Sequence, residues 1–118
     1  MKDFKELLVW QKSHLLTMAV YKITKSFPKD ELYSLTSQIR RSAMSVPSNI
    51  SEGCGRLSDK ELAHFLVIAS GSASELAYQL LLARDLNYIS ELDYDTLNAQ
   101  LTEIRKMLNA FVTKLKSN

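Results

Sequence analysis

The chain has 118 residues, of which 46% are hydrophobic and 24% are charged, and its formal net charge is +2. This length fits one domain, residues 1–118, and this composition excludes a wholly disordered chain. The single Cys cannot form an internal disulfide. No uninterrupted apolar run approaches the ~18 residues of a membrane span, and no secretory leader is evident, so we expect a cytoplasmic protein with no membrane partner.

Hydrophobic residues recur at helical spacing along the first part of the chain. Asp3 and Glu6 have the spacing of a capping box, in which each side chain accepts a hydrogen bond from a free backbone amide. A helix is therefore predicted to begin near Asp3. Pro28 is expected to end it, because proline disfavours the helical conformation of the preceding residue, Phe27.

A second helix is predicted from about Glu31 into the Asn49–Gly53 region. Its apolar line comprises Leu32, Leu35, Ile39, Ala43, Val46 and Ile50. Pro47 lies inside this line, where it removes a backbone donor and crowds the preceding turn. Because the pattern resumes in phase at Ile50, we expect one helix kinked near Pro47 rather than two separate helices.

Two further helices follow, and each begins with a serine cap. Ser58 with Glu61 opens the third helix, and Ser90 with Asp93 opens the fourth. Their inner lines are Leu62, Phe65, Leu66, Ala69, Ala73, Leu76, Leu80 and Ala83, then Leu97, Leu101, Ile104, Leu108, Phe111 and Leu115. Four helices with short connections and no competing strand pattern predict an all-α fold, an up-down antiparallel four-helix bundle.

The first and third helices are apolar on more than one side. Leu7–Trp10 covers most of a helical turn, and Val67, Ile68, Leu81 and Leu82 widen the apolar face of the third helix. A helix of this kind is central or is buried from two directions. We therefore expect copies of the chain to associate, although bundles also expose some leucine without an interface.

A second stripe of residues, all capable of directed hydrogen bonds, recurs at helical spacing beside the apolar line of the second helix. Its members are Gln38, Arg41, Ser45, Asn49, Glu52 and Arg56, and the third helix carries a shorter stripe of Ser72, Glu75 and Gln79. Gly71 precedes the shorter stripe in mid-helix. Because glycine costs ~1 kcal/mol relative to alanine there, it suggests a close helix approach.

Three interpretations of these stripes stay open. In the first, they form a structural polar network or a subunit interface, with Arg41 or Arg56 paired to an acidic residue. That acidic residue would be Glu75 or Glu52. In the second, a ligand or RNA groove is built on Arg40, Arg41 and Arg56. In the third, the stripes simply face solvent.

We find no catalytic constellation in the sequence. His14 and His64 are the only imidazoles, and neither belongs to an HxxxH or Glu-x-x-His pair, so no metal site is predicted. Cys54 lies between two glycines, but the local sequence supplies no base to activate it. We predict no enzymatic activity and no cofactor.

The central part of the chain resembles a known family. The matching segments are LTSQIRR from Leu35 to Arg41, SVPSNISEG from Ser45 to Gly53, Arg56, and Ala69-Ser-Gly71-Ser72 followed by Glu75-Leu76. The first helix and the Phe27-Pro28-Lys29 turn match as well. The chain is thereby similar, over nearly its whole length, to the bacterial four-helix bundle family, also called the ribosomal-RNA intervening-sequence protein or S23-like family.

The resemblance implies antiparallel four-helix bundles that assemble into a ring of five subunits. A similar branch, the accessory variability determinant of diversity-generating retroelements, works with a reverse transcriptase and binds nucleic acid through a basic ring surface. By position, Arg40, Arg41 and Arg56 are the basic residues of the motif, whereas Pro47 and Gly53 look structural. The net charge of +2 is lower than that of a strongly basic nucleic-acid binder.

We therefore expect a non-enzymatic, homo-oligomeric helical scaffold or adaptor, for which the resemblance implies a homopentamer. Its further partner would be another protein. The alternative is an RNA- or DNA-binding accessory protein that uses a basic ring surface.

Overall fold

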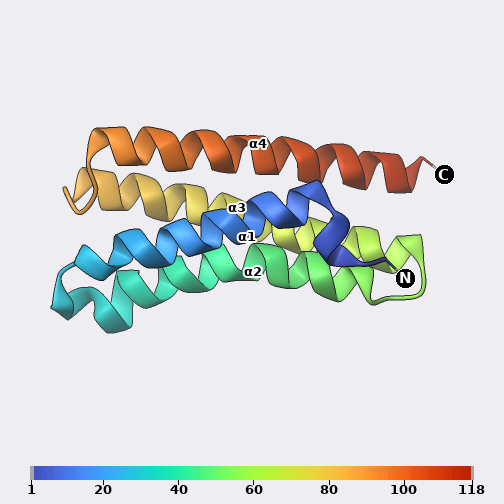
Figure 1. The fold of residues 1–118 in the computed structure, drawn as a ribbon, viewed down its shortest axis with the longest axis horizontal. Helices are drawn as coiled ribbons and strands as arrows, with labels where there is room; N and C mark the ends of the chain where they lie inside the picture. Colours follow the sequence, from blue (N-terminus) through green and yellow to red (C-terminus); the bar gives the residue numbers. More distant parts are fainter. Residues whose placement is uncertain (1, 118) are drawn as a thin grey trace.

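The computed structural model describes residues 2–117, which form four long helices (Figure 1). The helices are α1 (Leu8–Ile23), α2 (Ser37–Cys54), α3 (Asp59–Asp85) and α4 (Glu91–Lys116). Each helix packs against the next one along the chain, and α1 also packs against α4, which closes the bundle around one core. No strand occurs in residues 2–117. The predicted all-α, up-down four-helix bundle is confirmed.

The beginning of the chain differs from the prediction. Asp3 caps only a short 3-10 turn, Phe4–Glu6. Leu7 is extended, with φ −80° and ψ 125°, so α1 begins one residue later rather than near Asp3. A long-range contact accompanies this difference, because the Lys2 amide donates to the Cys54 carbonyl at 3.0 Å and ties the leading segment to the end of α2.

The connection between α1 and α2 is more irregular than the sequence suggests. Helix α1 ends at Ile23, four residues before the predicted stop. The connection contains two 3-10 turns and a π turn, at Thr24–Ser26, Lys29–Glu31 and Leu32–Thr36. Ser34 has non-helical dihedral angles, φ −125° and ψ −107°, and regular α2 begins only at Ser37 rather than near Glu31.

Helix α2 continues through Pro47 without a break, as the in-phase pattern predicts. A proline inside a helix leaves the carbonyl four residues earlier without its amide donor. That carbonyl belongs to Ala43, and the Thr17 hydroxyl of α1 lies 3.0 Å from it. The same hydroxyl lies 2.8 Å from the Ser13 carbonyl, so its one proton serves both acceptors. A contact between α1 and α2 thus compensates for the proline.

The predicted starts of α3 and α4 are confirmed. The Ser58 hydroxyl accepts a hydrogen bond from the Glu61 amide at 3.1 Å. The Ser90 hydroxyl likewise accepts one from the Asp93 amide at 3.0 Å. Between the two helices, Asn87 adopts a left-handed φ of 62°, the conformation that commonly ends an α-helix.

The core consists mainly of the predicted apolar lines. All four helices contribute, and α3 alone supplies seven of the core side chains. Leu32 is an exception, since it lies in the π turn before α2 and is 45% exposed. Helix α3 is also long and apolar enough to span a membrane, judged by length and composition only. Its packing between α2 and α4 is that of a bundle helix.

Candidate interface

Polar side chains of α2 and α3 meet along one line between the two helices. Ser45 Oγ and Ser72 Oγ lie 2.8 Å apart and join the helices directly. One turn further along α2, Asn49 Nδ2 donates to the Ser45 carbonyl at 2.8 Å and lies 3.0 Å from its hydroxyl. We call Ser42, Ser45, Asn49, Ser72 and Glu75 the polar seam. It unites several residues of the two predicted stripes.

The carboxylate of Glu75 is held by a hydroxyl rather than by a guanidinium. Ser42 is buried on α2, and its Oγ donates to Glu75 Oε1. Within residues 2–117, neither Arg41 nor Arg56 forms an ion pair with Glu75. The sequence analysis missed Ser42, although its position four residues after Gln38 places it on the same helical stripe.

Arg56, two residues after the end of α2, pairs with Glu52 in the last turn of that helix, which is one of the pairings expected from the sequence. The Arg56 Nη2 lies 2.9 Å from the Glu52 Oε1, and the guanidinium lies 4.8 Å from the centroid of the Phe65 ring. The two charged side chains are 44% and 56% exposed. An exposed ion pair contributes only about 0.2–1 kcal/mol, so this pair adds little to the stability of the fold.

The three arginines of the predicted groove do not form one cluster. Arg40 is partly buried, and its Nε donates to Thr24 Oγ1 at 2.8 Å. Arg41 and Gln38 are exposed, and their side chains form no hydrogen bond or ion pair with any other described residue. Arg41 lies in the second turn of α2, whereas Arg56 lies two residues beyond the end of that helix. The 13 residues from Arg41 to the end of α2 alone span roughly 20 Å at the helical rise of ~1.5 Å per residue.

Two glycines of these helices lie in opposite surroundings. A Cβ at Gly53 would lie 2.9 Å from the side chains of both Leu62 and Phe65, so α2 and α3 meet too closely there for a larger residue. Gly71 was expected to mark such an approach, but a Cβ added there has no atom within 4 Å. Within one chain that expectation is wrong, and Gly53 marks the close contact instead.

Two buried polar atoms lack a hydrogen-bond partner among residues 2–117. They are Thr36 Oγ1 and Gln79 Oε1, and their side chains are 3% and 8% exposed. A buried polar group left without a partner typically costs ~1–3 kcal/mol. Gln79 extends the α3 stripe beyond Glu75. Ser72 and Glu75 each have a hydrogen-bond partner on α2, whereas the side-chain oxygen of Gln79 has none among the described residues.

Cys54 is shielded from reaction. Its side chain is 1% exposed. Burial raises the pKa of the thiol, and the nearby charge of Lys2 only partly opposes this shift. The thiolate, which is the nucleophilic form, is therefore disfavoured at neutral pH.

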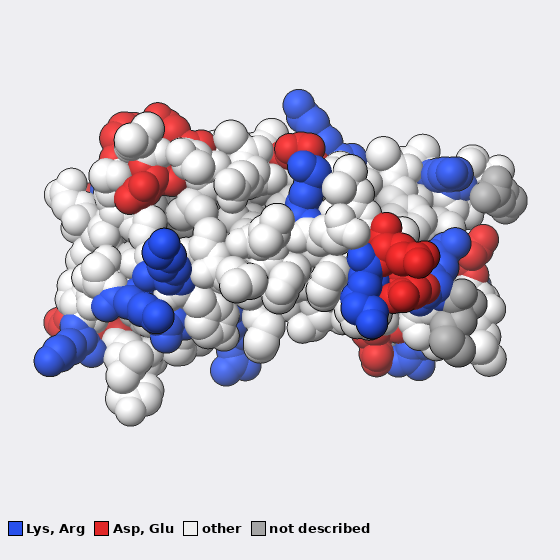
Figure 2. Space-filling view, viewed as in Figure 1, with Lys and Arg blue, Asp and Glu red and all other residues white. Residues whose placement is uncertain are grey.

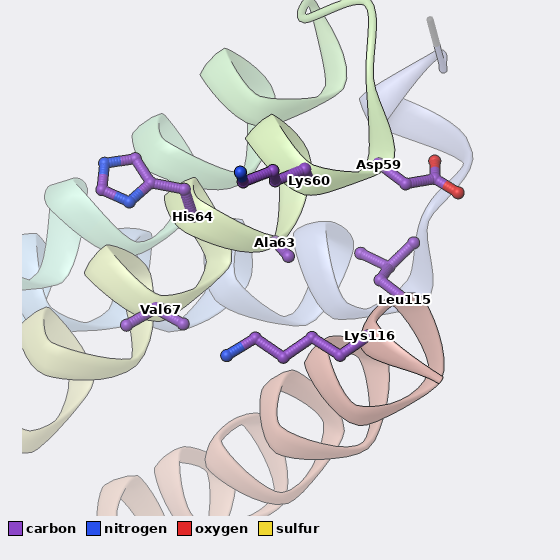
Figure 3. Close-up of a pocket in the computed structure, with 7 residues that line it drawn as sticks. All are labelled: Asp59, Lys60, Ala63, His64, Val67, Leu115 and Lys116. Carbon is purple, nitrogen blue, oxygen red and sulfur yellow. The ribbon is translucent and has the colours of Figure 1, made fainter. Parts of the chain in front are cut away.

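A hollow of about 630 Å³ lies between the start of α3 and the end of α4 (Figure 3). Figure 3 shows Lys60 and His64 on the α3 side and Lys116 on the α4 side. Among the described residues of the lining, no nucleophile is paired with a base, and Asp59 supplies the only carboxylate. In the part of the chain that the structure describes, no three His, Cys, Asp or Glu side chains gather as a metal site.

The outer faces of α1 and α3 carry uncovered apolar side chains. On α1, Leu8, Leu15 and Met18 are 56%, 64% and 58% exposed, and on α3 Val67 and Ile68 are 48% and 40% exposed. Figure 2 shows a largely uncharged surface across the middle of the face on which α1 lies. The predicted apolar surplus is therefore present at Leu8, Val67 and Ile68, whereas Leu81 and Leu82 are half-buried.

These features define a small helical bundle with a polar seam between two helices and apolar side chains on its outer faces. The chain belongs to the 23S rRNA-intervening sequence protein family, whose model matches residues 5–110. The family resemblance seen in the sequence is thereby confirmed. The description of this family names no enzymatic activity.

A solved structure has the same architecture. It is a crystal structure of a protein with unknown function from the S23 ribosomal protein family of Bacteroides thetaiotaomicron. The two chains are 29% identical, with a TM-score of 0.80 over 89% of this chain and 98% of that chain. A comparison with curated proteins gives no match.

Proposed function

We propose that the chain is a non-enzymatic, homo-oligomeric helical scaffold or adaptor of the cytoplasm. The observation that carries this proposal is the apolar surface outside a core that is already closed. Leu15 on α1 and Tyr78 on α3 are 64% and 61% exposed although the inner faces of both helices are buried. Association of copies would remove such surface from water, at roughly 25 cal/mol for each Å² of apolar area.

The proposed assembly is a ring of five subunits, the number that the family resemblance implies. The α1–α2 side and the α3–α4 side of the bundle differ in sequence, so a contact between them joins unlike surfaces. Contacts of this kind close into a ring when a whole number of equal rotations between neighbours adds up to 360°. A ring would repeat any weak site for a partner protein and so raise its avidity.

Light scattering after size-exclusion chromatography at micromolar concentration tests the association. We expect the wild type to elute as an oligomer and Leu15→Glu to lower its mass, because a carboxylate would replace an apolar contact. Thr113→Glu, at an exposed position near the end of α4, is the matched control and should retain the wild-type mass. A wild type that elutes at the 13.4 kDa of one chain would overturn the proposal.

The second candidate is an RNA- or DNA-binding accessory protein. It is favoured by the exposed Arg41 and by the five basic residues between positions 18 and 44. Phosphate contacts weaken steeply with salt, so titration with mixed RNA at about 50 mM and 200 mM salt tests it. Binding that falls with salt and that Arg41→Ala weakens supports this function. No binding at the lower salt concentration contradicts it.

A further inference from the structure

One end of the bundle carries opposite charges on its two sides. Residues 18–44, from the end of α1 into α2, contain five basic and two acidic residues, a net charge of +3. Residues 76–102, from the end of α3 into α4, contain one basic and four acidic residues, a net charge of −3. Figure 2 shows basic side chains at the lower left and an acidic cluster at the upper left.

The asymmetry is confined to this end. In the other half of the bundle, the α1–α2 side (residues 1–17 and 45–57) and the α3–α4 side (residues 58–75 and 103–118) each carry a net charge of +1. We call Lys22, Lys25, Lys29, Arg40 and Arg41 the basic edge. We call Asp85, Glu91, Asp93 and Asp95 the acidic edge.

The chain itself neutralises little of this charge. Arg84 lies 3.1 Å from Asp85 and 3.8 Å from Glu91, which accounts for half of the acidic edge. Asp93 and Asp95 form no ion pair with another described residue, and neither does any member of the basic edge. Of these nine side chains only Arg40 is partly buried, and the others are exposed.

The two edges lie at the same level of the bundle. The Tyr88 hydroxyl, in the turn between α3 and α4, donates to the Glu31 carboxylate at 2.7 Å. The ring centroids of Tyr88 and Phe27 lie 5.4 Å apart. These contacts join the α1–α2 connection to the α3–α4 turn. The two charge clusters are therefore at one height, on opposite helix pairs.

Both edges also carry uncovered apolar side chains. On the basic edge, a hollow of about 550 Å³ is lined by Tyr21, Leu32, Tyr33, Ser37, Arg40, Arg41 and Met44. Beside the acidic edge, Tyr78, Leu86 and Leu92 are 61%, 44% and 74% exposed. Each edge thus offers apolar contact area beside an excess of charge of one sign, as in contacts that have an apolar centre and a polar rim.

The geometry points to a head-to-tail contact between parallel copies, in which the basic edge of one chain packs against the acidic edge of the next. This contact rests on the proposed self-association and specifies its faces. Because both edges lie at the same height, a rotation about an axis parallel to the helices brings them together, and its repetition closes a ring. A two-fold contact through either edge alone would place like charges opposite each other.

Charge-reversal variants test the contact by light scattering. K22E/K25E changes the net charge of residues 18–44 from +3 to −1, and D93K/D95K changes that of residues 76–102 from −3 to +1. Each variant alone places like charges across the contact, so we expect each to raise the concentration needed for assembly about tenfold or more. The quadruple variant restores opposite charges and should regain assembly.

A matched control reverses the same number of charges elsewhere. K60E/K106E changes two exposed lysines in the half of the bundle whose two sides carry equal charge, and it should assemble like the wild type. D93K/D95K also removes acidic residues from the start of α4, where the helix dipole favours them. If D93K/D95K does not fold, K22E/K25E tests the contact by itself. About 1 M salt should screen the repulsion between its like-charged edges and restore assembly.

Three results would overturn the contact. Wild-type assembly of K22E/K25E, or a folded quadruple variant that assembles no better than the double variants, removes the contact but leaves self-association standing. An unchanged oligomer mass of K22E/K25E together with loss of RNA binding makes the basic edge a nucleic-acid surface instead. A monomeric wild type removes the proposed function, and the contact with it.

Discussion

Side chains pack closely between α2 and α3 but loosely on the outer surface of the same bundle. Between the helices, a Cβ at Gly53 would approach two side chains to 2.9 Å, and Ser45 bonds Ser72 across the seam at 2.8 Å. On the outer surface, a Cβ at Gly71 would meet nothing within 4 Å, and Leu15 is 64% exposed. The space between α2 and α3 is therefore closely packed, whereas the outer faces are left available for contact.

Gly53→Ala should have the largest effect. The added methyl group must displace the Leu62 or Phe65 side chain, and overpacking of this kind typically costs ~1–3 kcal/mol of unfolding free energy. Urea denaturation measures the loss. Gly55→Ala is the matched control, because the nearest atom to its Cβ is an ordinary 3.5 Å away and its φ is −80°. Equal losses in the two variants would contradict the close approach at Gly53.

Thr17→Val should cost about 1 kcal/mol, the usual net contribution of one hydrogen bond. The variant keeps the shape of the side chain but removes the hydroxyl that lies 3.0 Å from the Ala43 carbonyl, which Pro47 leaves without a donor. Thr102→Val is the control, since that exposed hydroxyl donates only to the Asn98 carbonyl of its own helix. Equal losses of stability in the two variants would show that the Thr17 hydroxyl does not compensate for the amide missing at Pro47.

Gly71→Ala should stabilise the chain by about 0.5–1 kcal/mol. Alanine has the higher helix propensity, and the position is open within the chain. Chemical denaturation at a concentration below that of assembly measures the change. A loss of stability under those conditions would mean that the surroundings of Gly71 are as crowded as those of Gly53.

The contact between the two connections should give a small pH dependence. The hydrogen bond with Glu31 raises the pKa of Tyr88. Stability from this bond is thus fully present below the ordinary tyrosine pKa of about 10 and is lost as pH rises through the raised value. Tyr88→Phe should reduce the change of the unfolding midpoint between pH 8 and pH 11. Tyr33→Phe, at a 91% exposed position, should leave that change as it is in the wild type. An identical pH profile for wild type and Tyr88→Phe would show that this bond contributes nothing.

Local patterns predicted most of the fold. The serine caps at Ser58 and Ser90, the apolar lines and the continuity of α2 through Pro47 all follow from spacings within a few residues. The failures lie where distant segments meet. The Lys2 amide bonds the Cys54 carbonyl, and Glu31 accepts from Tyr88, so the true boundaries of α1 and α2 depend on contacts that no local window contains.

The polar stripes were predictable as positions, but of the expected pairings only that of Arg56 with Glu52 occurs among the described residues. Helical spacing identified Ser45, Ser72 and Glu75. Glu75, however, accepts a hydrogen bond from the hydroxyl of Ser42 rather than from the guanidinium that was expected. Long arginine side chains reach several neighbours, and the structure directs Arg40 to Thr24 and Arg56 to Glu52. Which of two nearby partners a flexible side chain selects depends on the packing of the helices, which the sequence pattern does not specify.

The mass of the wild-type protein in solution tests the central claim most directly. We predict that light scattering at micromolar concentration gives a multiple of the 13.4 kDa of one chain, and five times that mass for the proposed ring. A mass of 13.4 kDa that does not change between low and high protein concentration would contradict the account.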